Sequence, residues 1–351
     1  MPNSCWQEAP SDVIFKIMEH CEGCDAFNFA MTCTDVMKDY KTFIANGAYR
    51  PLVAPNGHVS EPEHGRFFAE IPPDVVNLQH AINRCPPGVA MLLLPGAHVI
   101  NQSLNLTNDV TLFGRGEASL ELLGVDGGED SIVHSTAKNA AIIGFVMRES
   151  ALLRNMDNPT IVTAVIVDDG HLHIQSCNVE EMINGFVVRE PSVVTLEACE
   201  MKALNFMRAW DSTITIVRCK IHVASDYGII ASGGRMTLTI LDSEMCDGSD
   251  AIDISNGATL IMERTKILGC SRALVLRRIN FHDSRIIDNK MWVDRNGITI
   301  VSSRNHARAW PRFSCIKGNE VVDDHGGVDV SSFVFASSDE NEELDYYDNI
   351  N

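Results

Sequence analysis

Apolar and polar residues alternate along much of this chain, and the alternation recurs at nearly regular intervals. Six segments share a small residue at the same place, here called the ladder positions: Cys177, Cys199, Cys219, Ser243, Thr265 and Ser284. Their separations, by subtraction of residue numbers, are 22, 20, 24, 22 and 19. The positions five and three residues before and two residues after each are apolar in all six segments. Alternation with period two within a fixed longer repeat predicts stacked coils of parallel β-strand.

Charged residues flank the ladder positions with alternating sign. The residues directly after them include Glu200, Lys220, Glu244 and Lys266, and those directly before include Arg218, Asp242, Arg264 and Asp283. Equivalent residues of stacked strands lie about 4.8 Å apart, and each pair of opposite charges contributes about 0.2–1 kcal/mol. We interpret these charges as fixing the register of the coils and not as catalytic groups.

The pattern divides the chain into four parts. Apolar residues at helical spacing predict a small helical module over residues 1–45, and prolines predict a connector over 46–73. The coils are predicted over 74–337, opened by an amphipathic helix that ends near Cys85. Residues 338–351 form an acidic tail that is predicted to be disordered.

Composition restricts the classes of partner. The 351 residues are 45% hydrophobic and 21% charged, with a formal net charge of -19 and a pI near 4.9. An acidic surface disfavours nucleic acid, which requires a concentrated basic surface. No run approaches the roughly 18 apolar residues of a membrane span, so no membrane interaction is expected.

The chain has 11 cysteines, and those at ladder positions alternate with serine and threonine. This exchange indicates packing of free thiols, which suits the reducing cytoplasm or nucleus. Cys21, Cys24 and Cys33, with Cys5, could suggest a zinc site, but the spacing lacks a second close pair. We expect helix packing there, and we expect neither a metal nor any other cofactor.

Residues 9–40 resemble an F-box. The segment APSDVIFKIM at residues 9–18 matches the opening of that family, and DAFNFAMTC at 25–33 matches its middle helix. The resemblance implies docking onto a Skp1-like adaptor of a cullin ligase. The contact residues it implies are Pro10, Val13, Ile14 and Ile17.

Residues 74–335 resemble the pectin-lyase-like right-handed, single-stranded parallel β-helix. The likeness rests on the opening helix, MLLLPG at 91–96, VTLFG at 110–114 and the coil period. It implies an all-β fold of nine to eleven coils. Together with the F-box, it resembles the F-box proteins whose β-helix repeats recruit substrates for ubiquitination. Similar pairings occur in large DNA viruses, which would place the protein in a host cell.

Pectin-lyase-like folds include lyases and sugar hydrolases, and the hydrolases use a pair of carboxylates. The candidates are Asp168 with Asp169, Asp250 with Asp253, and Asp323 with Asp324. Most adjoin turns, where aspartate bonds the local backbone. Asp253 is the one expected to face outward in mid-strand, and we expect no catalytic residue.

The second strand of each coil predicts a surface for a protein partner. An outward apolar strip flanked by arginine and tryptophan suits an interface. The residues assigned to this client-binding strip are Val187, Arg189, Met207, Trp210, Ile230, Val275 and Arg277. The alternative is that the connector or residues 291–335 cover the strip.

Two functions follow from the sequence. The first is a non-enzymatic, monomeric adaptor of an SCF-type ubiquitin ligase, with the F-box holding the Skp1-like protein and the β-helix holding a protein client. The alternative is a carbohydrate-binding or carbohydrate-active β-helix whose N-terminal helices cap it.

Overall fold

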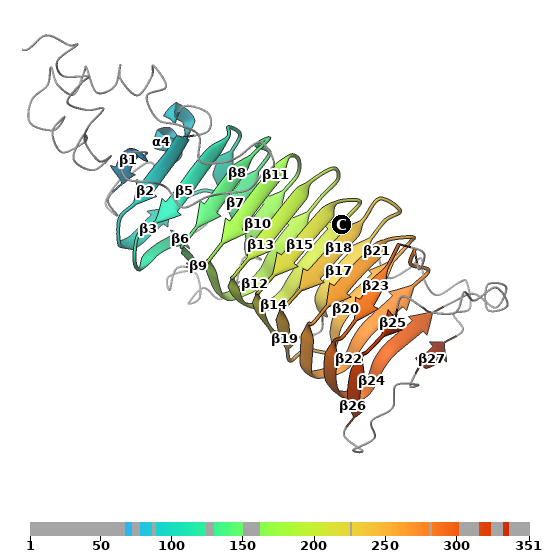
Figure 1. Ribbon diagram of the computed structural model, residues 1–351. Coiled ribbons are helices and arrows are strands. Elements are labelled where there is room, and N and C mark those ends of the chain that lie inside the picture. Colours follow the sequence, from blue (N-terminus) through green and yellow to red (C-terminus); the bar gives the residue numbers. More distant parts are fainter. Residues whose placement is uncertain are drawn as a thin grey trace, which may run out of the picture. The chain divides into compact units, whose positions relative to one another are not determined.

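The computed structural model describes residues 67–71, 78–85, 89–123, 130–149, 162–224, 227–280, 283–301, 316–323 and 333–336 (Figure 1). They belong to two compact units: unit 1 is residues 1–165 with 169–178, and unit 2 is residues 166–168 with 179–351. The predicted F-box, including Pro10, Val13, Ile14 and Ile17, lies outside the described residues, as do Cys5, Cys21, Cys24, Cys33 and the acidic tail.

The described part of unit 1 is a stack of short parallel strands, with a short helix between the first strand and the second. Its elements are β1 (Phe67–Ile71), α4 (Leu78–Arg84), β2 (Val89–Leu93), β3 (Gly96–Ile100), β4 (Leu104–Leu106), β5 (Val110–Gly114), β6 (Ala118–Leu122), β7 (Asp130–Ser135), β8 (Ala140–Ile143), β9 (Val146–Glu149) and β11 (His171–Gln175). One sheet runs β1-β2-β5-β8-β11. The expected connector over 46–73 therefore contains a paired strand, because β1 already stacks on β2.

Unit 2 continues the same kind of coil. Its elements are β13 (Val193–Glu197), β14 (Glu200–Trp210), β15 (Thr213–Val217), β16 (Lys220–Val223), β17 (Tyr227–Ser232), β18 (Thr237–Leu241), β19 (Glu244–Cys246), β20 (Asp250–Ser255), β21 (Thr259–Glu263), β22 (Lys266–Arg277), β23 (Arg285–Ile287), β24 (Lys290–Val301), β25 (Ile316–Lys317), β26 (Glu320–Asp323) and β27 (Phe333–Ala336). Two strands, β10 (Val162–Val167) and β12 (Asn178–Val188), carry residues of both units.

Each coil of unit 2 contributes to three faces. The first face is β13-β15-β18-β21-β23-β25, in which every pair is parallel. The long strand β14 pairs with β16 through Glu200–Ala203 and with β17 through Met207–Trp210. Its two halves therefore belong to different faces. The third face, built from the later half of β14 with β17, β20 and β22, carries the candidate site.

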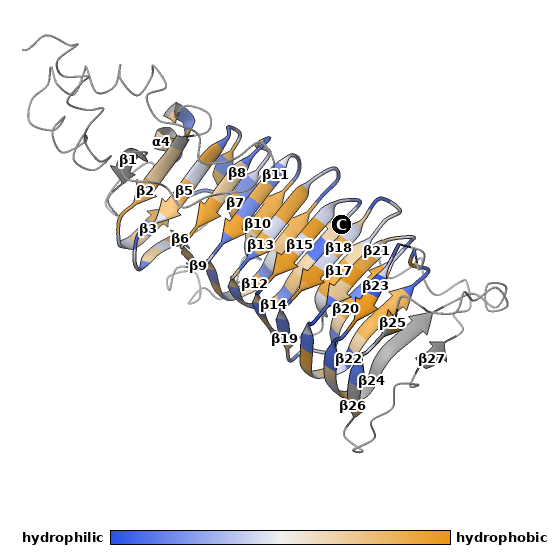
Figure 2. Cartoon of the chain, in the orientation of Figure 1, coloured by the Kyte–Doolittle hydropathy of each residue, from blue (hydrophilic) through white to orange (hydrophobic). Residues whose placement is uncertain are grey.

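A column of apolar side chains fills the inside of the coils. Ile214, Leu238 and Leu260 stack in register on the first face and are fully buried. Phe186 and Phe206 meet edge to face with ring centroids 5.6 Å apart. Figure 2 shows hydrophobic residues along the strands and hydrophilic residues at many turns. Burial of this column drives folding at roughly 25 cal/mol per Å² of apolar surface.

No described helix has the length and apolar character needed to cross a membrane.

A left-handed residue makes the bend that follows the first face. The residues before the first five ladder positions have φ between 50° and 55°: Ser176, Ala198, Arg218, Asp242 and Arg264. Asp288, directly before Asn289, has the same conformation. Non-glycine residues seldom adopt this region, so the surrounding contacts must hold them there. Each such residue turns the chain sharply into the next strand.

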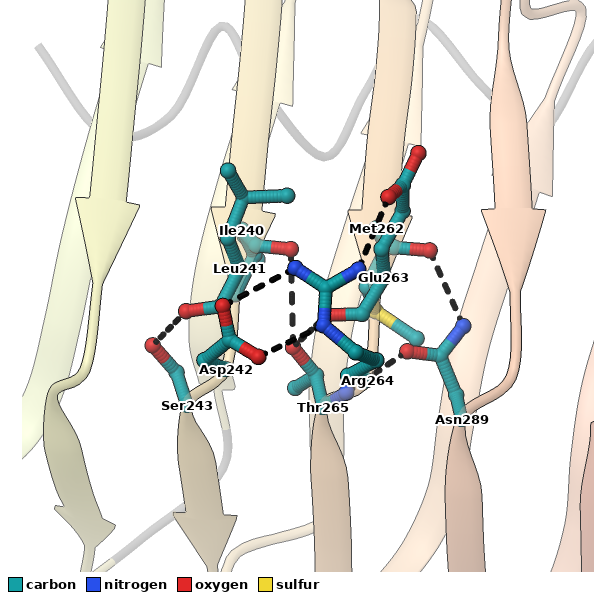
Figure 3. A network of polar contacts seen from close by, with 9 residues as sticks. All are labelled: Ile240, Leu241, Asp242, Ser243, Met262, Glu263, Arg264, Thr265 and Asn289. Carbon is teal, nitrogen blue, oxygen red and sulfur yellow. Dashed lines mark hydrogen bonds and ion pairs between the residues drawn. The ribbon is translucent and has the colours of Figure 1, made fainter.

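The ladder positions hold that bend by hydrogen bonds between coils. The Ser243 hydroxyl accepts the Cys219 N–H at 3.1 Å and donates to the Leu241 carbonyl at 2.8 Å. Thr265 N–H donates to Asn289 Oδ1 at 2.9 Å (Figure 3). Buried N–H groups without a partner are costly, and these side chains supply one.

The ladder prediction is wrong at its last step. Glu263 pairs with Ile287, so Thr265 is followed by Asn289 and not by Ser284. Ser284 is buried directly before β23, where its hydroxyl accepts the Leu260 N–H and donates to the Asn280 carbonyl. By the same shift, Asp288 and not Asp283 follows Arg264. The ladder continues to Asn319, whose Oδ1 accepts the Asn289 N–H.

The predicted charge pairing is confirmed over the regular coils. Glu200, Lys220, Glu244 and Lys266 are successive partners in the strand register. Arg264 donates from Nε and Nη2 to the two carboxylate oxygens of Asp242, at 2.6 and 2.9 Å (Figure 3). The Arg264 hydrogen bonds are the main reason that the pKa of Asp242 is lowered. Among the described residues the first face has five strands in unit 1 and six in unit 2, in agreement with the nine to eleven coils expected.

Candidate functional site

Two outward rows of side chains run along the third face of unit 2. The register pairs Arg208 with Ile230, Ile230 with Asp253 and Asp253 with Val275, which we call the Arg208 row. Two residues further along each strand come Trp210, Ser232, Ser255 and Arg277, which we call the Trp210 row. Both rows face away from the core because Ile229, Ile252 and Leu274, at the alternate positions, are fully buried.

The assignment of Met207 to an outward strip is wrong. Met207 pairs with the inward Ile229 and is 2% exposed, and Arg208 stands beside Ile230 instead. A shift of one residue moves every side chain of a strand to the opposite face. The sequence pattern placed Met207 level with Ile230, one residue away from its observed partner Ile229.

The remaining strip residues do not form a continuous exposed apolar surface. Val275 is in the outward register but has no exposed surface, while Ile230 and Val187 are half-buried. Arg189 Nη1 lies 2.8 Å from Asp168 Oδ1. Asp253 interrupts the Arg208 row between Ile230 and Val275. The geometry therefore removes the basis for an apolar docking strip along this row.

Asp253 is the carboxyl group that sequence reasoning expected to face outward, and the register places it there. It is 5% exposed, and Arg277 Nε lies 3.1 and 3.2 Å from its two oxygens. Burial raises the pKa of Asp253, and the nearby Asp250 carboxylate adds to this, while Arg277 and Arg272 oppose it. Burial outweighs the arginines, so Asp253 retains its proton to a higher pH than an exposed aspartate.

The other candidate carboxylates with described side chains are tied to structural partners. Asp250 is 1% exposed and receives Arg272 Nε and Nη2, each at 2.6 Å. Asp168 is paired with Arg189, and Asp169 Oδ1 accepts the Gly170 N–H at 2.6 Å. The side chains of Asp323 and Asp324 lie outside the described set. Among the described residues there is no cluster of three metal-binding side chains.

Trp210 stands out as an aromatic side chain open to solvent. It is 40% exposed and begins a row that continues through two hydroxyl groups to a guanidinium. Asn256 Nδ2 donates to Ser232 Oγ at 2.8 Å, which orients that hydroxyl. The sequence pattern identifies Trp210 and Arg277 as surface residues but does not identify Ser232, Ser255 and Asn256. Ser232 and Ser255 are polar residues at the ends of successive strands, and only the register between the coils shows that they lie side by side.

Comparison with known proteins bears on the fold. The family model described as "Right handed beta helix region" matches residues 162–332. Among solved structures, a polygalacturonase from Erwinia carotovora ssp. carotovora has a TM-score of 0.52 at 12% identity, over 80% of this chain and 99% of that one. The described residues fold as a right-handed parallel β-helix.

A second solved structure is similar to this β-helix. It is a Family 28 exopolygalacturonase from Yersinia enterocolitica, with a TM-score of 0.49 at 13% identity, over 74% of this chain and 64% of that one. No curated protein matches the chain.

Proposed function

We propose that this β-helix binds a carbohydrate chain along the Trp210 row. The observation that carries the proposal is the alignment of an exposed indole with two hydroxyls and a guanidinium, one from each of four successive coils. An aromatic ring offers an apolar face at low entropic cost, and a few placed polar groups fix orientation. A sugar ring has both an apolar face and a rim of hydroxyls, so it matches this combination.

The dimensions of the row suit an extended ligand. Successive coils lie about 4.8 Å apart, so three intervals separate Trp210 from Arg277 by roughly 14 Å. A chain of a few sugar units is of that length, whereas a single small molecule would contact one or two coils. The similarity to a polygalacturonase makes carbohydrate the first class of ligand to test.

The proposed role is binding without hydrolysis. Glycoside hydrolysis requires one carboxyl to protonate the leaving oxygen and a second to act as base or nucleophile. Asp168, Asp250 and Asp253 each bind an arginine of a neighbouring coil. Asp250 is also closed to solvent, so it lacks access to a substrate or water. These pairs support the coils, and none of the candidate carboxylates with described side chains is placed to act with Asp253 as the second catalytic group.

The test is calorimetric titration of the purified full chain with oligosaccharides derived from polygalacturonate, xylan and cellulose. We expect saturable binding of at least one of them, weakened at least tenfold in Trp210→Ala. Leu204→Ala is the matched control, since Leu204 is 41% exposed on the same strand, β14, but precedes the part that pairs with β17. Equal affinity in wild type and Trp210→Ala, or binding of no oligosaccharide, would refute the proposal.

Turnover provides a separate arm of the same test. Incubation with polygalacturonate and calcium should release no reducing ends or unsaturated products. Release that disappears in Asp253→Ala would overturn the non-catalytic part of the proposal and favour a carbohydrate-active enzyme.

We propose the SCF adaptor as a second function, on the strength of the F-box pattern in residues 9–40. The family match to the β-helix covers residues 162–332 and does not reach that segment. Under this proposal Pro10, Val13, Ile14 and Ile17 contact a Skp1-like adaptor, and the β-helix presents a client to the ligase in the cytoplasm or nucleus. Tethering raises the effective concentration of client and ligase without catalysis by this chain.

Co-purification with a Skp1-like protein tests the adaptor function. Wild type should retain the adaptor, and the double variant with Pro10→Asp and Ile17→Asp should lose it while Trp210→Ala keeps it. Failure of the wild type to bind would remove the adaptor function and leave the carbohydrate proposal untouched.

A further inference from the structure

Two thiols of unit 2 stack on one another across neighbouring coils. Glu197 pairs with Val217 and Glu200 pairs with Lys220, so Cys199 and Cys219 are held in register from both sides. The Lys220 N–H donates to the Cys199 carbonyl at 2.8 Å, which ties the two residues together at the bend. Their Cα atoms are thus separated by about one coil spacing, ~4.8 Å. Disulfides join Cα atoms roughly 4.4–6.8 Å apart.

The two thiols occupy equivalent places in neighbouring coils, and each donates to a backbone carbonyl of its own coil: Cys199 Sγ to Glu197 at 3.2 Å and Cys219 Sγ to Val217 at 3.4 Å. The Cys199 side chain is the main cause that lowers the pKa of Cys219, against the opposing effect of burial. Burial instead raises the pKa of both Cys85 and Cys177 to about 12. The thiolate is the reactive form of cysteine, so Cys219 is the better nucleophile of these three.

We propose that Cys199 and Cys219 form a reversible disulfide between coils when the protein meets a peroxide. The Cys219 thiolate attacks one oxygen of hydrogen peroxide, the O–O bond breaks, and the products are Cys219 sulfenic acid and hydroxide. Cys199 then attacks the sulfenic sulfur, the S–S bond forms, and the oxygen leaves as water. Two thiols lose two electrons to one peroxide, and a cellular dithiol such as reduced thioredoxin reverses the change.

The disulfide would close the coil that carries the indole of the proposed binding row. The segment between Cys199 and Cys219 contains β14, Trp210, the bend at Asp211 and β15. The two cysteines are 2% and 1% exposed, so peroxide reaches them when the coil opens locally. Once formed, the bond opposes that opening and stabilises the coil.

Peptide mapping tests the bond directly. The full chain is treated with hydrogen peroxide under native conditions, free thiols are alkylated, and the protein is digested without reduction. Mass spectrometry should find the Cys199 and Cys219 peptides joined, two hydrogens lighter than their sum, and separated again by dithiothreitol. We expect oxidised wild type to unfold at a temperature several degrees higher than the reduced protein.

Serine variants provide the controls, because the chain itself uses serine at the equivalent ladder position, Ser243. Cys199→Ser should abolish the linked peptide and the thermal shift, and should leave a dimedone-reactive sulfenic acid on Cys219. Cys177→Ser should leave the linked peptide unchanged. Absence of the linked peptide in wild type, or its formation in denaturant alone, would overturn the proposal.

Discussion

Arg277 Nε lies 3.1 Å from Oδ1 and 3.2 Å from Oδ2 of Asp253, a residue of the preceding coil. This charge pair joins the two outward rows of the third face, since Asp253 belongs to one and Arg277 to the other. It stands within the strip assigned to a protein client, where the sequence predicts that Asp253 faces outward and that Arg277 flanks the apolar residues. The stability of the protein should also depend on pH through this pair, because burial raises the pKa of Asp253 by more than Arg277 lowers it.

Asp253→Asn should change how stability varies with pH. The folded protein holds the Asp253 proton more tightly than the unfolded chain does, whose aspartate pKa is about 3.9. Wild type therefore loses stability as pH rises through the window above ~3.9, and Asp253→Asn does not. The unfolding free energy of the variant, measured by urea denaturation, should improve relative to wild type between acidic and neutral pH.

Asp242→Asn is the control of opposite sign. The pKa of Asp242 is lowered, so wild type gains stability as pH rises through the window just below the ordinary aspartate value, and the variant forgoes that gain. A difference between Asp253→Asn and wild type that stays constant with pH would contradict the raised pKa.

Met207→Ala and Trp210→Ala should have contrasting effects on stability. Met207 is 2% exposed and faces the core, so truncation should destabilise by about 2–4 kcal/mol. Trp210 is 40% exposed on the outer face, so its truncation should change stability by less than about 1 kcal/mol. Chemical denaturation of both variants checks this prediction. A larger loss of stability in Trp210→Ala than in Met207→Ala would contradict the observed register and favour an outward Met207.

Asn289→Ala should weaken the bend between two coils. Asn289 is fully buried, its Oδ1 accepts the Thr265 N–H at 2.9 Å, and its Nδ2 donates to the Met262 carbonyl at 3.0 Å (Figure 3). Alanine leaves the Thr265 N–H without this acceptor, which costs about 1–3 kcal/mol.

Asn289→Ser is the matched variant, because a serine hydroxyl performs the same task for the Cys219 N–H. It should be less destabilised than Asn289→Ala in urea denaturation. Equal losses for the two variants would indicate that packing and not the acceptor decides the effect.

Gly228→Ala should disturb the third face, whereas Gly234→Ala should not. A Cβ at Gly228 would lie 2.3 Å from the Ala251 carbonyl oxygen of the next coil, so backbone must move. Overpacking of this kind destabilises by about 1–3 kcal/mol or more. At Gly234 the nearest atom to an added Cβ is the Asn256 carbonyl oxygen at 3.9 Å, which is ordinary contact. Thermal denaturation of the two variants should separate them, and similar melting temperatures would count against the close approach.

The sequence by itself determined the coil and its inward face. Alternation around Cys199, Cys219, Ser243 and Thr265 predicted which side chains are buried, and the structure confirms it. The charge pairing of Lys220 with Glu244 and Glu244 with Lys266 followed from the same register. These features depend only on one bend and the strand on each side of it, where the alternation of side chains fixes which residues face inward.

Only the tertiary structure decided the register of the third face and the end of the ladder. Phe206 lies 7 residues after Cys199, whereas its partner position Gly228 lies 9 residues after Cys219, by subtraction of residue numbers. A bend of variable length separates the faces, so the pattern of one strand does not specify its partner in the next coil. Ser284 misled for a related reason, since a buried serine hydroxyl can find partners either at the bend after a first-face strand or directly before such a strand, as its bonds to Leu260 and Asn280 show. Hydrogen bonds between coils decide both the register of the third face and the place of Ser284. These bonds join residues far apart in the sequence, so no single segment predicts them.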